Sequence, residues 1–276
     1  MDQDVTGRTD AELLRETLES AQARHGAAAL RRMEDAVEVA EGRKPPYVSP
    51  EPLQRPGFYL PGLTATPWHD PLQHPAGRIL EESWEVIRDE VIAARDRREG
   101  FQRFLEVGDI ASADLSTALF LKQEPLSCAD NRALCPRTAA IVDAIPRVGE
   151  VVMVSALNPG AKLVPHCGPW NFRLTMHLGL VIPEGGWIRV ANETRTWQEG
   201  KCLLFDDSFD HEVQIHARST RIILLMHLWH PELTDPEVDF LAAVRSALAA
   251  RDRDRTIRMV EEARRNLAGQ KWWVDA

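Results

Sequence analysis

The sequence has no cluster of basic residues and no long apolar segment. Its 42 acidic side chains outnumber the 33 basic ones, which gives a formal net charge of -9. Proteins that bind nucleic acid or anionic membranes neutralise phosphates with clustered Lys and Arg, so we expect neither partner. Apolar runs such as 222–226 are far shorter than the ~20 residues of a membrane-spanning helix. Residues 1–6 are acidic and polar, so we expect no secretory signal and no membrane span.

Cysteine is also scarce, with four residues and no C-x-x-C pair. So few cysteines cannot build a disulfide scaffold, and their spacing does not match a structural zinc site. A reduced, cytoplasmic protein is therefore predicted. The chain of 276 residues with 44% hydrophobic content is large enough for one main domain with a real core and a smaller unit beside it.

Helical patterns lie at both ends of the chain. Thr9 to Glu12 match a capping box, and His25-Gly26 interrupts the apolar periodicity, so 9–41 is predicted to form a helical hairpin. Repeated prolines predict an extended linker over 46–56. We assign 1–45 to a hairpin appendage, 57–234 to the main domain and 235–276 to a C-terminal helical extension.

The main domain contains short β-rich runs separated by turn residues. The runs cover 151–155, 173–182, 186–190, 202–205, 212–216 and 221–229. Strands this short, without helices between them, predict an antiparallel sandwich or barrel. Amphipathic helices are predicted at 77–95 and 136–144, and the first should cover a sheet.

Three residues of this β-rich region form a candidate metal and co-substrate site. His166 follows a turn, and His211 lies in a loop immediately before a predicted strand. Two imidazoles from distant strands suit a non-haem Fe(II) site. Arg221, ten residues after the second histidine, can bind a dicarboxylate such as 2-oxoglutarate through two parallel hydrogen bonds. Each residue alone is more typical of a structural role, so the hypothesis depends on their combination. Structural roles are assigned to His216, His227 and His230.

Four blocks of sequence carry a resemblance to a known family. They are PHCGPWNFRLTMHLGLVIP at 165–183, ANETRTW at 191–197, FDDSFDHEV at 205–213 and WHPEL at 229–233. Together they resemble the aspartyl/asparaginyl β-hydroxylase family over roughly 58–233. The resemblance implies a double-stranded β-helix, a cupin-like jelly roll, that binds Fe(II), 2-oxoglutarate and O₂ and hydroxylates a C–H bond with release of succinate and CO₂.

The resemblance also implies residue roles. His166 and His211 would bind iron, and Ser155 and Arg221 would hold the distal carboxylate of 2-oxoglutarate. His177 would support the metal-chelating end of that molecule. Arg173 would lie on the substrate side.

Two positions depart from common patterns. Gly168 stands where the usual facial triad of such enzymes has Asp or Glu, as it does in this family, so no carboxylate ligand is expected. Asp207, or its neighbours Asp206 and Asp210, can compensate by accepting a hydrogen bond from an iron-bound water, or can serve only as turn residues. Thr175 replaces a second arginine of the peptide-hydroxylating members, which disfavours an acidic substrate.

The sequence therefore predicts a dioxygenase that β-hydroxylates an Asp or Asn residue, a free amino acid or a carrier-bound aminoacyl group. An alternative within the family is hydroxylation of a lipid A-type acyl chain. An alternative from another class is a metal-binding cupin without turnover, which would act as a sensor or binding module. The substrate is expected to be a small molecule or a peptide, and the sequence favours no oligomeric state.

Overall fold

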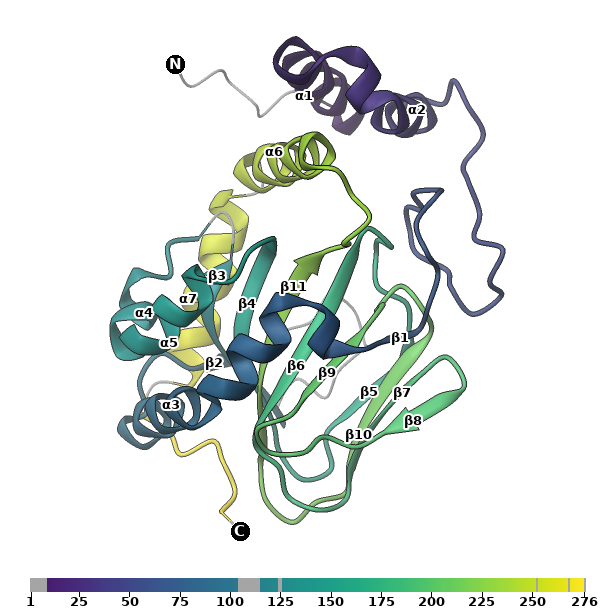
Figure 1. Ribbon diagram of the computed structural model, residues 1–276. Helices are drawn as coiled ribbons and strands as arrows, with labels where there is room; N and C mark the ends of the chain where they lie inside the picture. The colour runs from purple at the N-terminus through teal and green to yellow at the C-terminus, as the bar shows by residue number, and fades with distance from the viewer. Residues whose placement is uncertain (1–8, 104–114, 124–125, 252, 268, 276) are drawn as a thin grey trace.

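The core of the molecule is formed by β-strands. In a computed structural model, residues 9–103, 115–123, 126–251, 253–267 and 269–275 are described. The strands are β1 (Trp68–His69), β2 (Gln102–Arg103), β3 (Ser116–Gln123), β4 (Val148–Leu157), β5 (Lys162–His166), β6 (Arg173–Val181), β7 (Gly186–Val190), β8 (Glu193–Arg195), β9 (Cys202–Phe205), β10 (His211–Ile215) and β11 (Arg221–Trp229). They form a seven-stranded sheet in the order β1-β9-β6-β11-β4-β3-β2 and a four-stranded sheet in the order β5-β10-β7-β8 (Figure 1).

The order of these strands identifies the fold. Along the chain, β4, β6, β9 and β11 enter the large sheet, while β5, β7, β8 and β10 enter the small one. The pairings between the named strands are antiparallel. Chain winding of this kind between two facing sheets is a double-stranded β-helix, and it confirms the predicted fold class.

Each predicted β-rich run is a strand, but the sequence did not reveal the short strands β1, β2 and β8 or the longer strands β3 and β5. In β5, Lys162, Val164 and Pro165 are exposed, so this edge strand lacks the alternation that marks a half-buried strand. In β3, the first six residues are all buried, and a continuous buried run does not show a period of two.

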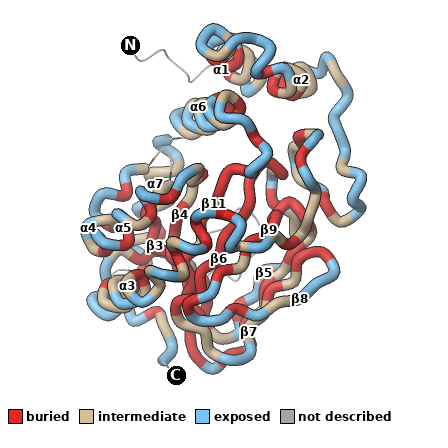
Figure 2. The backbone as a smooth tube through the Cα atoms, in the orientation of Figure 1, coloured by how far each residue is buried: buried red, intermediate tan, exposed pale blue. Residues whose placement is uncertain are grey.

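Helices cover the outer face of the large sheet and one end of the molecule. They are α1 (Asp10–His25), α2 (Arg31–Ala40), α3 (Pro75–Arg97), α4 (Ala129–Leu134), α5 (Pro136–Asp143), α6 (Asp235–Arg251) and α7 (Arg253–Leu267), with short 3₁₀ turns at Ala27–Leu30 and Pro71–Gln73. Helices α3 and α5 match the two predicted in the main domain, and α3 lies on the sheet with α4, α5 and α7 (Figure 1). The residues buried between these layers form the main core (Figure 2). None of the described helices is long and apolar enough to span a bilayer.

The N-terminal hairpin packs on the C-terminal helix α6. The predicted capping box is present, since Thr9 Oγ1 accepts a hydrogen bond from Glu12 N and the Glu12 carboxylate accepts one from Thr9 N. Leu18, Leu30 and Met33 are buried in one apolar cluster with Leu60, Phe172, Trp229 and Phe240. Arg32 of α2 pairs with Glu237 of α6 through two short contacts of 2.6 and 2.8 Å. The hairpin and the barrel are therefore joined through shared apolar contacts.

The proline-rich segment also packs on the barrel. Gln54 is buried, and its side-chain amide donates to Asp206 Oδ2 at 2.9 Å and to Ser208 Oγ at 3.0 Å. The backbone N–H of Asp210 donates to Leu53 O at 2.7 Å. This segment therefore braces the loop that leads from β9 to β10.

The C-terminal residues lie against the start of β11. Trp272 packs on Phe101 with ring centroids 4.6 Å apart. Its carbonyl accepts a hydrogen bond from the Asn158 side chain at 2.5 Å. Val274 exchanges hydrogen bonds with Thr220, the residue before β11. These contacts fix the strand end that carries Arg221.

Candidate active site

The two predicted metal ligands lie side by side in the small sheet. His166 is the last residue of β5, and His211 is the first residue of β10 rather than part of the preceding loop, which corrects the sequence-based placement. The two residues are direct cross-strand partners, and their ring centroids are 4.1 Å apart. The β-ladder alone therefore holds both imidazoles at one position in the barrel.

Hydrogen bonds fix the tautomer of both rings. His166 Nδ1 lies 2.8 Å from Val164 O, and His211 Nδ1 lies 2.9 Å from Phe209 O. Because a carbonyl oxygen can only accept, each Nδ1 carries a proton, and Nε2 is the nitrogen of each ring that can bind a metal. Burial and the neighbouring His166 lower the pKa of His211 to about 4. His211 is therefore neutral at pH 7, which is the form that binds a metal.

The structure explains why no carboxylate follows His166 by two residues. A Cβ atom on Gly168 would lie 2.6 Å from Asp207 Oδ1 and 2.9 Å from Asp207 O, so any side chain is excluded there. Asp207 itself fills this space. Within the described ranges, no group of three or more His, Cys, Asp or Glu side chains is arranged to hold a metal ion.

Asp207 is held by two donors and keeps one oxygen uncommitted. Its Oδ2 accepts from Thr175 Oγ1 at 3.1 Å and from Arg173 Nη2 at 3.3 Å. Its Oδ1 is buried and has no hydrogen-bond partner in the part of the chain that the structure describes. Burial raises the pKa of Asp207, but the electrostatic effect of Arg173 and the nearby histidines lowers it by a larger amount. The net shift of the pKa is therefore downward. The ionised Oδ1 is suited to accept a hydrogen bond from a water beside the metal.

The other two acidic residues of this loop have structural contacts. Asp206 accepts hydrogen bonds from Ser208 and Gln54. Asp210 pairs with Arg189 at 2.7 Å. The geometry thus favours Asp207 over its neighbours for a role beside the metal.

Arg221 is a buried cation that faces no carboxylate among the described residues. Its Nη1 donates to Ser155 O at 3.4 Å, and its Nε has no hydrogen-bond partner there. The guanidinium stacks 4.8 Å from the centroid of the Trp197 ring. Burial lowers the pKa of Arg221 to about 9, so the side chain is still charged at pH 7. A buried charge without a partner is costly, and an anionic ligand would offset that cost.

His177 lies near both Arg221 and His211. Trp197 Nε1 donates to His177 Nδ1 at 3.1 Å, so the proton of this neutral ring is on Nε2. Burial and the charge of Arg221 hold the pKa of His177 well below its usual value. The Phe205 ring contacts both His177 and His211, at centroid distances of 4.9 and 6.1 Å. His177 can therefore donate a neutral N–H to a ligand that reaches from Arg221 to the metal.

A second buried charge cluster surrounds Arg173. Its Nη1 lies 2.5 Å from Glu150 Oε1 and 3.1 Å from His227 Nδ1, in addition to the contact with Asp207. Glu150 reaches the barrel interior because the β4–β11 register shifts opposite His227, where Met226 pairs with Val152 and Leu228 with Val148.

The donor set fits the predicted ligands. Two imidazoles with available Nε2 atoms suit a divalent metal, and a buried unpaired guanidinium suits a dicarboxylate. The chain matches the family model described as Aspartyl/Asparaginyl beta-hydroxylase over residues 81–231, which is more than half of its length. It belongs to the aspartyl/asparaginyl β-hydroxylase family.

Similar proteins from three organisms carry names that describe different hydroxylases or hydroxylase domains. The human protein named aspartyl/asparaginyl beta-hydroxylase is 39% identical over 205 residues, which is 69% of this chain and 26% of that protein. The rat aspartate beta-hydroxylase domain-containing protein 2 is 33% identical over 71% of this chain and 62% of its own length. The Rhizobium tropici ornithine lipid ester-linked acyl 2-hydroxylase is 33% identical over 60% of this chain and 61% of its own length. The chain thus spans about a quarter of the human relative and less than two thirds of the other two.

The family resemblance did not identify every residue of the site. Trp197 ends one of the matching blocks, but its contacts with His177 and Arg221 depend on how the segment after β8 folds over the barrel. Glu150 directly precedes the predicted strand 151–155, and only the irregular register of β4 shows that it faces inward. His227, assigned a structural role from the sequence, lies beside Arg173.

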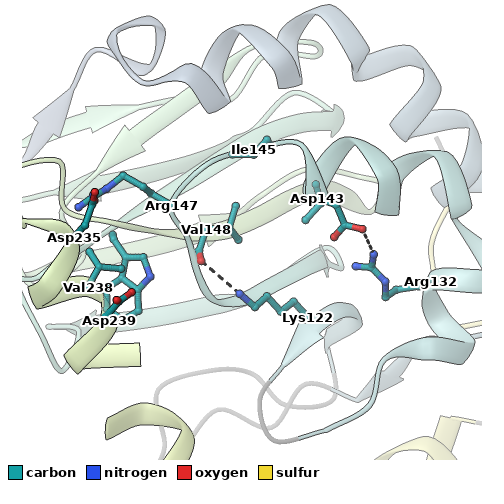
Figure 3. A pocket seen from close by; sticks show the side chains of 11 residues that line it. Lys122, Arg132, Asp143, Ile145, Arg147, Val148, Asp235, Val238 and Asp239 are labelled. Carbon is teal, nitrogen blue, oxygen red and sulfur yellow. Dashed lines mark hydrogen bonds and ion pairs between the residues drawn. The ribbon is translucent and has the colours of Figure 1, made fainter. Parts of the chain in front are cut away.

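A separate cavity of about 470 Å³ lies outside this site (Figure 3). Its cations are already engaged: Arg147 pairs with Asp235 at 2.7 Å, Arg132 pairs with Asp143 at 2.5 Å, and Lys122 donates to Val148 O at 3.4 Å. None of the predicted site residues lines it. The candidate active site is therefore the barrel interior and not this cavity.

Proposed function

We propose that this protein is an Fe(II)- and 2-oxoglutarate-dependent dioxygenase that β-hydroxylates an Asp or Asn residue, a free amino acid or a carrier-bound aminoacyl group. The observation that carries the proposal is a cross-strand pair of imidazoles in a barrel that also holds a buried guanidinium facing no carboxylate among the described residues. When bound, the iron and 2-oxoglutarate supply the oxidising power that inserts one oxygen atom of O₂ into a C–H bond and leaves the other in succinate.

The side chains have distinct tasks in this proposal. His166 and His211 bind the metal through Nε2. Arg221, next to Ser155, binds the distal carboxylate of 2-oxoglutarate, and His177 donates its Nε2–H to the metal-chelating end.

Asp207 and its partners complete the site. Asp207 accepts a hydrogen bond from a water beside the metal, and Arg173 and Thr175 hold its carboxylate in place. Because the barrel encloses these groups, bulk water is excluded and each polar contact is stronger than it would be in water. The protein's contribution is therefore ligand binding, orientation and exclusion of water.

A second candidate is hydroxylation of an acyl chain. It is favoured by the similarity to the Rhizobium tropici relative, whose name describes that reaction on an ornithine lipid.

We also propose a cytoplasmic location, because Cys128, Cys135, Cys167 and Cys202 are all free thiols.

Succinate formation tests the proposal. With Fe(II), ascorbate and 2-oxoglutarate, the protein is expected to release succinate slowly even without substrate. Replacing His166 or His211 with Ala should reduce that rate by about 100-fold or more, because each removes a metal ligand. His216→Ala is the matched control, since this exposed histidine directly follows β10 and its side chain lies 3.0 Å from Gln214 Oε1, away from the histidine pair.

Two outcomes would contradict the proposal. One is full turnover in either ligand variant. The other is metal binding by the wild-type protein without any succinate, which would identify a non-catalytic cupin. Mass spectrometry for a gain of one oxygen on amino-acid, peptide and acyl-lipid substrates would then distinguish the two candidate reactions.

A further inference from the structure

We propose that the substrate group recognised beside Arg173 is a primary amide, as in an Asn side chain, and not a carboxylate. The inference rests on the proposed function, because it names the substrate of the same site. Its basis is the charge and the hydrogen-bond state of the cluster formed by Arg173, Glu150, Asp207 and His227.

The positive charge of Arg173 is already matched inside the protein. Arg173 contacts Glu150 Oε1 at 2.5 Å and Asp207 Oδ2 at 3.3 Å, and all three side chains are at most 10% exposed. Its guanidinium is thus committed to two carboxylates of this chain.

The guanidinium of Arg173 already faces two negative charges of this chain. Burial raises the pKa of Glu150, but the contact with His227 and the charge of Arg173 outweigh it and lower the pKa. The net shift for Asp207 is also downward, so both carboxylates are ionised at pH 7. A substrate carboxylate would be a third anion in this buried space.

Two atoms of the Arg173–Glu150 pair that lack hydrogen-bond partners among the described residues define what the cluster can bind. Glu150 Oε2, an acceptor, and Arg173 Nε, a donor, are buried without hydrogen-bond partners among the residues described. Asp207 Oδ1 is the third such atom, and it faces Gly168 at the metal side. A primary amide has N–H donors for Glu150 and a carbonyl acceptor for Arg173, whereas a carboxylate has no donor at all. Buried groups left unpaired are costly, so the amide is the complement of this pair.

The cluster lies directly under a partly exposed side chain. The Trp170 ring is 5.0 Å from the Arg173 guanidinium and is only partly buried. Arg173, Thr175 and His177 stand at every second position of β6, so their side chains lie on the same face of the sheet. Arg173 and Thr175 therefore face the same interior as the proposed 2-oxoglutarate site. A substrate that displaces the Trp170 ring therefore meets Arg173 and Glu150 beside the metal.

A pair of matched peptides that differ only in Asn or Asp at one position tests the inference. We expect the Asn peptide to bind at least about tenfold more tightly by calorimetry and to gain one oxygen, because only the amide satisfies both orphaned atoms. Glu150→Gln, which removes one negative charge and supplies a donor, should reduce the Asn-to-Asp preference by about tenfold or more.

Glu237→Gln is the matched control. Glu237 is also a buried glutamate in an ion pair, with Arg32, but it lies on α6 at the hairpin. It should leave the peptide preference unchanged. Equal or tighter binding of the Asp peptide, binding of neither peptide, or an unchanged preference in Glu150→Gln would each overturn the inference. Absence of succinate formation would contradict the proposed function instead, while the binding ratio would still decide the nature of the recognised group.

Discussion

Gly168 and Asp207 together account for the two-histidine character of the candidate metal site. The space that a side chain at 168 would need is filled by the Asp207 carboxylate and backbone carbonyl, and Gly168 N donates to Asp207 O at 2.6 Å. In the proposed site, the Asp207 carboxylate from the loop before the second histidine lies where a side chain at 168 would otherwise be. The glycine is therefore a requirement of close packing.

Replacing Gly168 with Ala should destabilise the protein by about 1–3 kcal/mol, because the new methyl group overlaps Asp207 and forces the site apart. Urea unfolding would measure the change. Gly57→Ala is the control, since its added Cβ would meet only Pro169 O at an ordinary 3.7 Å. Equal stability of the two variants would show that Asp207 moves away without cost.

At the scale of single residues, the sequence predicts the candidate site residues that stand in local sequence motifs. His166, His211 and Arg221 were predicted from residue type and position, and Ser155 and His177 from the family resemblance, and the structure brings all five into one barrel interior. Glu150 and Trp197 were missed, because a register shift and a loop crossing determine where their side chains lie. Neither feature leaves a pattern in hydropathy.

At the scale of elements, the loop between β9 and β10 is held in place by residues 53 and 54 of the proline-rich segment. Gln54 inserts into the loop and bonds Asp206 and Ser208, and Leu53 O receives the N–H of Asp210. The prolines predict an extended segment over 46–56, but they cannot show how it packs on the barrel. The side chain that fastens it, Gln54, is polar and is buried only because its partners are polar too.

Asp206 should make the stability of this element depend on pH. Burial raises the pKa of Asp206 to about 7, although the hydrogen bonds from Ser208 and Gln54 lower it. The folded protein thus holds this proton more tightly than the unfolded chain, so the contribution of Asp206 is full below pH about 4 and is lost as the pH rises toward 7.

Comparing the wild type with Asp206→Asn isolates this effect from other titrating groups. Between pH 4 and pH 8 the free energy of unfolding of the wild type should fall relative to the variant by on the order of 4 kcal/mol. Denaturant unfolding at several pH values would measure it. A difference that is independent of pH would show that Asp206 is already ionised in the folded state at pH 4.

At the scale of the whole molecule, the hairpin of α1 and α2 shares its apolar cluster with α6 and the barrel. Leu18 of α1 is fully buried in it. Leu18→Ala should therefore lower the free energy of unfolding by about 2–5 kcal/mol, as is typical of a large-to-small core substitution. Leu72→Ala, at a position that is 47% exposed, is the control and should change it little.

The eight tryptophans make this prediction specific, because none precedes residue 68. The indole rings therefore belong to the barrel and the C-terminal region, although Trp229 also borders the cluster shared with the hairpin, whereas far-ultraviolet circular dichroism reports on all helices. If the hairpin and barrel unfold as one unit, Leu18→Ala shifts both signals equally. A shift in circular dichroism without a shift in fluorescence would instead support the hairpin as a separate appendage.

Strand β11 lies in the middle of the large sheet, between β4 and β6, although it follows β4 by about seventy residues in the chain. During synthesis the ribosome must release β11 before either neighbour can complete its ladder. Until then, β4 and β6 expose edges and apolar faces that invite pairing with other chains. We therefore expect the insertion of this strand to be a slow step of folding, during which the nascent chain is prone to aggregate.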